Sequence, residues 1–308
     1  MKDFFERLNT LGKTKRNDII EKDFHLHRLL SMITKDEYLN KNLVFKGGTC
    51  LIKAYTGYHR FSEDIDFTWK NDEIWKNKTT GEVKKSCSNE ISKVIRHIKA
   101  ISDELGLKFS GDKNNTDEVH ISSGGRMVVF FLGYLSDILN IPSKIKVEIN
   151  FVDITLYPII NKKLKSYIYE LKSDELKFLY ENLWNEYYTD IEIDCYDSRE
   201  LFIEKCRAAL TRKGYKLRDV IDLYIMEKRF GYQVSKFKPK IRTKIEFMLD
   251  LYKRYRENIE FVQFPSKNVL DNEEMKLMLI PTPKDFQRKI AQVHTQLNET
   301  RNEFIKSI

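Results

Sequence analysis

The stretch from residue 45 to residue 69 constrains the fold of this chain more than any other segment. It reads FKGGTCLIKAYTGYHRFSEDIDFTW, so a short apolar run ends in the glycine pair Gly47 and Gly48. Polar and apolar residues then alternate from Asp64 onward, which is the period of a β-strand. The alternation predicts that the Asp64 and Asp66 carboxylates lie on the same side of one strand, roughly 6–7 Å apart along it.

A glycine turn followed by paired carboxylates suits a site for a triphosphate and its metal ions. Backbone N–H groups at a strand-to-helix turn can donate to phosphate oxygens, and Thr49 adds a hydroxyl beside Gly47 and Gly48. Asp64 and Asp66 offer the hard oxygen ligands that Mg²⁺ prefers. The alternative is that the glycines only turn the chain, Thr49 caps the following helix, and the aspartates mark a solvated strand edge.

A two-metal site needs a third carboxylate, and the sequence offers two candidates. Residues 145–151 alternate between apolar and polar side chains, which predicts a strand with Glu148 on its polar face. Glu148 could ligate a metal ion, act as a general base, or only form a salt bridge. Asp153 is the fallback, although it has the parity of the apolar face unless the strand has already ended.

The hydrophobic patterns divide the chain into an α/β part and a helical part. In the first part we expect helices at 18–34, 50–55 and 88–106 and strands at 43–45, 64–69, 126–134 and 145–151. We expect a loop or short hairpin at 72–87 and a loop at 110–125. From about residue 198 the pattern is mostly helical, with helices expected at 198–213, 218–230, 242–260 and 283–308. We therefore predict an α+β protein, with a mixed sheet and flanking helices in residues 1–190 and a helical domain in residues 191–308.

The composition is typical of a soluble protein in a reducing compartment. The 308 residues are 41% hydrophobic and 12% aromatic, which is enough for a substantial core. The net charge of +8 favours a polyanionic partner such as nucleic acid. The four cysteines have no paired spacing, and we find neither a signal peptide nor an apolar run of about 18 residues. We expect a cytoplasmic protein with no membrane span.

Two segments of the helical part carry charges among apolar residues. Lys205 shares a predicted helix face with Leu201 and Ala208, where a buried ammonium is unfavourable. Asp219 and Asp222 share a face of the next predicted helix. The simple explanations are that Lys205 extends its head into water and that Asp219 complements the helix dipole. Asp222 lies between two apolar residues and is harder to explain in this way.

These residues resemble a known family. G-G-T-x-L at 47–51 and R-x-S-x-D-I-D-F at 60–67 resemble the nucleotidyltransferase fold of the DNA polymerase β type, and more narrowly the AbiEii/AbiGii abortive-infection toxin family. Three more segments of the chain resemble segments of that family, namely IEKDF at 20–24, EKCRAAL at 204–210 and RDVIDLY at 218–224. The resemblance implies a sheet of the polymerase-β type followed by a helical domain.

The resemblance also implies roles for the matching residues. The carboxylates that hold Mg²⁺, with two ions expected and Mn²⁺ as an alternative, would be Asp64, Asp66 and Glu148. Glu148 stands where the wider pattern usually has Asp. The residues that bind the nucleotide would be Gly47, Gly48, Thr49, Ser62, Lys205 and Asp219. Lys205 would neutralise triphosphate charge, and Asp219 or Asp222 would hold a base, a sugar hydroxyl or this lysine.

The implied activity is transfer of a nucleoside monophosphate from an NTP to RNA. The expected acceptor is the 3′ end of a tRNA, and the expected setting is the toxin of a type IV toxin–antitoxin or abortive-infection system with a cognate antitoxin. One alternative is a catalytically silent module that binds NTP or RNA, which the clustered carboxylates weigh against. Another is a small-molecule nucleotidyltransferase, which the basic charge and the Lys205 and Asp222 motif weigh against.

Basic residues interleaved with aromatic ones at 236–244 and 252–256 are candidate RNA contacts. The alternative is an ordinary solvated helix face.

Overall fold

Two compact units make up the chain, and the computed structural model describes residues 1–12, 14, 16–252, 254–265 and 273–306 of it. The α/β unit consists of Met1–Asp153 and Ile159–Cys195, and the helical unit consists of Ile154–Pro158 and Tyr196–Ile308. The chain therefore leaves the α/β unit after Asp153, returns to it at Ile159, and leaves it again after Cys195.

A seven-stranded mixed sheet forms the centre of the α/β unit, in the order β3-β4-β5-β2-β1-β7-β6. Strand β2 pairs antiparallel with β1 and parallel with β5, while β4 pairs antiparallel with β3 and β5. The strands are β1 (Leu43–Lys46), β2 (Asp64–Trp69), β3 (Val119–Ser122), β4 (Met127–Leu135), β5 (Pro142–Asn150), β6 (Ile159–Leu164) and β7 (Ile191–Tyr196).

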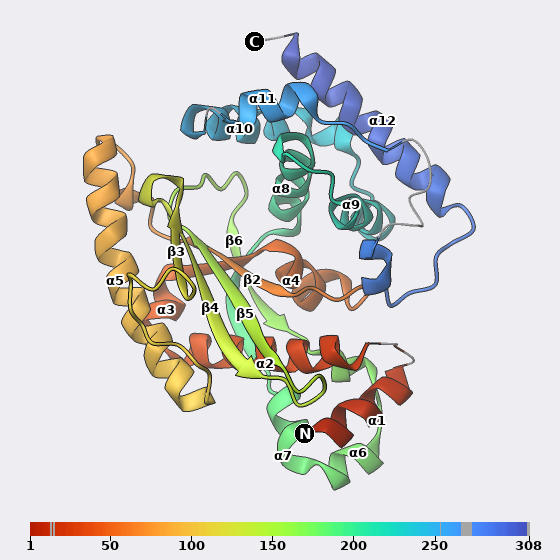
Figure 1. The fold of residues 1–308 in the computed structure, drawn as a ribbon. Coiled ribbons are helices and arrows are strands. Elements are labelled where there is room, and N and C mark those ends of the chain that lie inside the picture. The colour runs from red at the N-terminus through yellow and green to blue at the C-terminus, as the bar shows by residue number, and fades with distance from the viewer. Residues whose placement is uncertain (13, 15, 253, 266–272, 307–308) are drawn as a thin grey trace. The chain divides into compact units, whose positions relative to one another are not determined.

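One face of this sheet is apolar and buried. Along β5, Ile145, Val147 and Ile149 are fully buried and alternate with partly exposed polar residues, and α2 contacts this strand. The helices of the unit are α1 (Lys2–Gly12), α2 (Asn17–Lys35), α3 (Glu37–Asn42), α4 (Gly47–Leu51), α5 (Thr80–Leu105), α6 (Asp174–Leu179) and α7 (Glu181–Tyr187) (Figure 1). The opposite face of β2 and β5 carries a row of partly exposed polar side chains, and these residues include the carboxylates predicted from the sequence.

The strand-to-helix turn after β1 depends on glycine. Gly47 has φ +79°, a left-handed backbone that favours a residue without a Cβ. Helix α4 begins at this residue and continues as a π-helical turn over Ile52–Thr56, which ends at Gly57 with φ +70°. The predicted order of strand, glycine turn, helix and second strand is confirmed.

The helical unit is a bundle around α8. This helix packs against α9, α10, α11 and α12, and α12 also packs against α9 and α10. The helices are α8 (Ser198–Thr211), α9 (Leu217–Phe230), α10 (Val234–Leu251), α11 (Arg254–Phe261) and α12 (Phe286–Ile305).

The structure differs from two sequence expectations in the α/β unit. The segment 72–87, expected as a loop or short hairpin, instead contains the first turns of α5, which begins at Thr80 because Thr79 and Glu82 form a capping box. The expected loop at 110–125 contains the edge strand β3, which pairs with β4. Within the described residues, no helix is both long and apolar enough to span a membrane.

Candidate active site

Strand register collects the predicted carboxylates on one face of the α/β unit. On β2, Asp66 is the register partner of Glu148 on β5 and of Lys46 on β1. Asp64, two residues earlier on the same face, is the register partner of Lys146. The three carboxylates named by the sequence are therefore neighbours, and two lysines stand among them.

The glycine turn lies directly against one of these carboxylates. A Cβ added at Gly47 would lie 2.1 Å from Oδ2 of Asp66, a distance that no real side chain tolerates. A Cβ at Gly48 would lie 2.7 Å from Nη2 of Arg60 and 3.0 Å from Oγ of Ser62. The absence of side chains at both glycines is thus what lets the turn approach the residues of the R-x-S-x-D segment.

Thr49 joins the turn to strand β2. Its side chain is buried, and its hydroxyl donates a hydrogen bond to the backbone carbonyl of Asp64. The hydroxyl that the sequence assigns to phosphate binding is therefore engaged with the protein in this structure. Thr49 holds the start of α4 beside the carboxylate strand.

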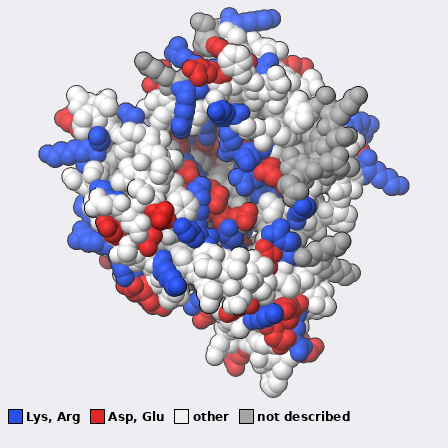
Figure 2. Space-filling view, in the orientation of Figure 1, with Lys and Arg blue, Asp and Glu red and all other residues white. Residues whose placement is uncertain are grey.

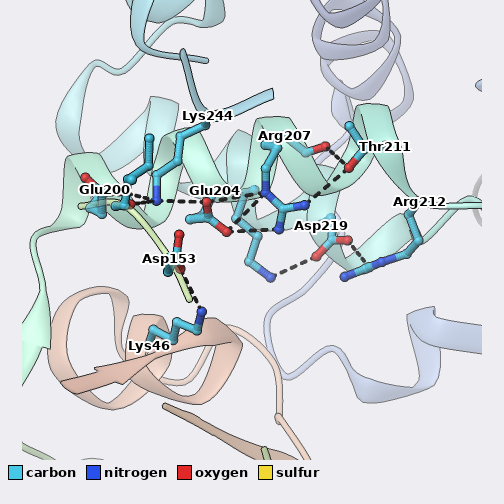
Figure 3. Close-up of polar contacts among 11 residues, drawn as sticks. Lys46, Asp153, Glu200, Glu204, Arg207, Thr211, Arg212, Asp219 and Lys244 are labelled. Atoms are coloured by element: carbon cyan, nitrogen blue, oxygen red, sulfur yellow. Dashed lines mark hydrogen bonds and ion pairs between the residues drawn. The ribbon is translucent and has the colours of Figure 1, made fainter. Parts of the chain in front are cut away.

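Two lysines form ion pairs that offset the negative charge of carboxylates in this region. Nζ of Lys146 lies 3.2 Å from Oε2 of Glu148 and 3.9 Å from Oδ2 of Asp64. Strand β5 ends at Asn150, so the parity argument does not extend to Asp153, whose Oδ2 lies 3.0 Å from Nζ of Lys46 (Figure 3). The fallback carboxylate thus pairs with the residue next to the glycine turn.

The pKa of Asp66 is raised by its surroundings. Burial, reinforced by the nearby Glu148 and Asp64 carboxylates, raises the pKa of Asp66 to about 6. Burial lowers the pKa of Lys146, but Glu148 and Asp64 outweigh burial and the net shift is upward. An unusually basic carboxyl group beside a phosphate-type turn is a mark of a functional site.

The donor set fits Mg²⁺ by its chemistry. Asp64, Asp66 and Glu148 offer only carboxylate oxygens, which this ion prefers, and their register places them side by side. In the part of the chain that the structure describes, however, no group of three acidic, His or Cys side chains is arranged as a metal site. Metal binding here therefore requires these side chains to rearrange, with Asp64 and Glu148 leaving their ion pairs with Lys146.

A second charged cluster lies within the helical unit. Nζ of Lys205 on α8 is 2.8 Å from Oδ1 of Asp219 and 2.9 Å from Oδ2 of Asp222, both on α9. Arg212 also pairs with Asp219 (Figure 3). Burial alone would raise the pKa of Asp219, but Lys205 and Arg212 outweigh it and hold the pKa below its usual value. Lys205 is thus held by both aspartates and does not extend into water.

Two charged residues of these clusters, Lys146 and Lys46, were not predicted as site residues from the sequence. Lys146 could have been found, because it lies two residues before Glu148 and therefore on the same polar face of the strand. Lys46 has no such local signal, because its partner Asp153 is set by tertiary packing. Arg212 is a candidate nucleotide or RNA contact by its sequence, with an ordinary surface position as the alternative, and the structure pairs it with Asp219.

A glycine turn beside a carboxylate strand is typical of proteins that act on nucleotides. Comparison with known families agrees with this class. Residues 28–302 match the family described as "Nucleotidyl transferase AbiEii toxin, Type IV TA system", and the chain belongs to that family.

Comparisons with individual proteins add two structures. None of the curated proteins compared with this chain matches it. A "putative nucleotidyltransferase from H. pylori" is similar, with 15% identity, a TM-score of 0.41, and coverage of 93% of this chain and 96% of that one. The crystal structure of JHP933 from Helicobacter pylori is also similar, with 15% identity, a TM-score of 0.39, and 92% of both chains covered.

Proposed function

We propose that this chain is a Mg²⁺-dependent nucleotidyltransferase that transfers a nucleoside monophosphate from an NTP to an RNA acceptor, with the 3′ end of a tRNA as the expected target. Its family consists of toxins of type IV toxin–antitoxin systems, which implies a cognate antitoxin as partner. The proposal specifies the substrate, the acceptor and the metal, which family membership alone leaves open.

The observation that carries the proposal is the packing of Gly47 against Asp66. The turn brings backbone N–H groups, which can donate to phosphate oxygens, next to a carboxylate that can ligate a cation. A triphosphate bound by the turn would thus lie beside Asp64, Asp66 and Glu148. A turn that served only to reverse the chain would not need contact with a carboxylate.

The proposed reaction is a displacement at the α-phosphorus of the NTP. The acceptor hydroxyl oxygen forms a bond to the α-phosphorus, the bond from that phosphorus to the bridging oxygen breaks, and pyrophosphate leaves. The hydroxyl proton goes to a carboxylate, for which Glu148 is a candidate, or to water. Mg²⁺ held by the three carboxylates would supply charge neutralisation for the phosphates and activation of the hydroxyl.

We extend the proposal to Lys205 of the helical unit. Its ammonium would neutralise triphosphate charge, and Asp219 and Asp222 would orient it through the two ion pairs described above.

The RNA acceptor is supported by part of the basic segment at 236–244. Lys236 and Lys240 are exposed on α10, and Nζ of Lys240 lies 4.6 Å from the centre of the Tyr157 ring. Lys244 is fully buried and forms ion pairs with Glu200 and Glu204, so it is not part of an RNA-binding surface (Figure 3). In the second segment, Lys253 lies outside the described residues. On the face drawn in Figure 2, basic side chains are interspersed with acidic ones, so net charge alone does not define an RNA surface.

The proposal is tested with four NTPs, each labelled with ³²P at the α-phosphate. The chain is incubated with Mg²⁺ and total RNA, beside Asp66→Asn and a matched surface variant, Asp72→Asn, whose side chain is 47% exposed. We expect label in RNA from at least one NTP with the unmodified chain and with Asp72→Asn, and none with Asp66→Asn or with excess EDTA.

The outcomes separate the alternatives. Failure to label any RNA, or equal labelling by Asp66→Asn, would contradict the proposal. Label recovered only in a small molecule would favour a small-molecule nucleotidyltransferase. NTP binding without transfer would favour a silent binding module.

A further inference from the structure

One lysine stands inside the carboxylate group of the proposed metal site. Lys146 projects from the same face of β5 as Glu148, and its register partner on β2 is Asp64. Its ammonium is within 4 Å of a carboxylate oxygen from each of these residues. The Lys146 side chain is 32% exposed, so it lies at the solvent edge of the cluster.

The charge around this lysine explains its position. Asp64, Asp66 and Glu148 bring three carboxylates together on adjacent strands, where each is at least partly shielded from water. Like charges at such spacing repel one another unless a cation lies among them. The ammonium of Lys146 provides that cation, and its two ion pairs hold Asp64 and Glu148 in positions that do not form a three-ligand metal site in the described part of the chain.

We propose that Lys146 is a built-in counter-cation that competes with the divalent metal ion for Asp64 and Glu148. A divalent ion bound by these carboxylates would repel the ammonium, so Lys146 must leave them as the metal binds. Lys146 therefore sets the metal affinity of the site, and makes formation of the metal site depend on a rearrangement of this side chain. The inference rests on the proposed metal site and adds a residue that tunes it.

The matched variants follow from the chemistry of this side chain. Lys146→Met keeps much of its length and removes the charge, while Lys146→Arg keeps the charge. Lys144→Met is the control, because Lys144 is an exposed lysine on the same strand whose ammonium donates to the backbone carbonyl of Asp117.

The experiment measures Mn²⁺ binding directly, from the electron paramagnetic resonance signal of free Mn²⁺ titrated with each purified protein in the absence of nucleotide. We expect Lys146→Met to bind Mn²⁺ about tenfold more tightly than the unmodified chain, because two partly exposed ion pairs no longer compete. Lys146→Arg and Lys144→Met should bind within about twofold of the unmodified chain. The rise in melting temperature on adding Mn²⁺ should be larger for Lys146→Met than for the others.

Equal or weaker Mn²⁺ binding by Lys146→Met would overturn the inference and leave the metal site standing. Equal tightening by Lys144→Met would also overturn it, because the effect would then reflect net charge alone. Absence of Mn²⁺ binding in every folded variant would overturn both this inference and the metal dependence of the proposed function. Circular dichroism of each variant establishes that it is folded.

Discussion

Gly47 and Asp66 are in contact in a way that excludes any side chain at position 47, since an added Cβ would lie 2.1 Å from Oδ2 of Asp66. The positive φ of Gly47 adds a second reason for glycine. The same contact places the proposed phosphate turn against the proposed metal ligand.

Gly47→Ala should therefore impair the site. We expect transfer activity to fall by about 100-fold or more, because Asp66 must move, and the free energy of unfolding to fall by at least about 1 kcal/mol from backbone strain. Labelled-NTP transfer and urea unfolding measure the two effects. Gly81→Ala is the control, since a Cβ there meets nothing within 4 Å. A Gly47→Ala variant with unchanged activity would contradict the proposed turn.

Lys205→Met should destabilise the helical unit. Asp219 and Asp222 are almost completely buried and both pair with this ammonium, so removing it should lower the free energy of unfolding by about 3 kcal/mol. Transfer activity should fall as well, with a higher KM for the NTP. The exposed Lys213→Met serves as the control in thermal unfolding. Equal melting temperatures of the two variants would show that the Lys205 ion pairs contribute little.

Asp23→Asn should be destabilising for a related reason. Nζ of Lys53 is fully buried and lies 2.8 Å from Oδ1 of Asp23, whose other oxygen accepts hydrogen bonds from Tyr58 and Tyr187. Without the carboxylate, the ammonium loses its counter-charge, at about 3–5 kcal/mol. Because Lys53 lies in the π-helical turn after α4, activity should fall too.

The control for this prediction is Asp103→Asn, which removes an exposed pair with Lys99 and should change stability by less than about 0.5 kcal/mol. Urea unfolding of the two variants tests it. Equal midpoints would mean that the buried network is not a significant source of stability.

Acid should destabilise the α/β unit through two buried histidines. Burial lowers the pKa of His25 to about 4 and that of His27 to about 3, from an ordinary value near 6.5. Below about pH 6.5 these histidines bind protons in the unfolded chain but not in the folded chain. The free energy of unfolding is therefore retained above that pH and falls as the pH is lowered. Each histidine should account for about 1.6 kcal/mol between pH 6.5 and pH 5.

His27→Gln tests this pH dependence. Nε2 of His27 donates to the backbone carbonyl of Thr189, a bond that a glutamine amide can also make, but glutamine does not titrate. The variant should lose less stability than the unmodified chain between pH 7 and pH 5, while His120→Gln, at an exposed position, should not differ from it. Parallel stability curves for the variant and the unmodified chain would contradict this account.

RNA binding should depend on the exposed lysines of α10. The double variant Lys236→Gln and Lys240→Gln should reduce the slope of log binding constant against log salt by about one for each RNA phosphate that the protein no longer neutralises. The matched double variant Lys84→Gln and Lys85→Gln removes the same charge from exposed positions on α5 and should leave the slope unchanged. Filter binding of tRNA at several salt concentrations provides the measurement, and an unchanged slope for the α10 variant would exclude this surface.

The sequence by itself determined the local features of the site. Alternation from Asp64 onward and at 145–151 predicted two strands and the faces of Asp66 and Glu148, because side-chain direction along a strand has a period of two. Gly47 at the end of an apolar run predicted the turn before α4. The helical half was also visible, since apolar spacing along a helix is a local property.

Only the tertiary structure decided which of these residues meet. The pairing of Asp66 with Glu148 depends on β5 lying beside β2 in one register. The alternating pattern fixes only the face of each side chain, so a shift by two residues would keep the pattern and change the partners. The ion pairs of Lys146, of Lys46 with Asp153, and of Lys205 with both Asp219 and Asp222 follow from packing between elements. Sequence periodicity places a charge on a face, but the partner of that charge comes from another element and is chosen by the fold as a whole.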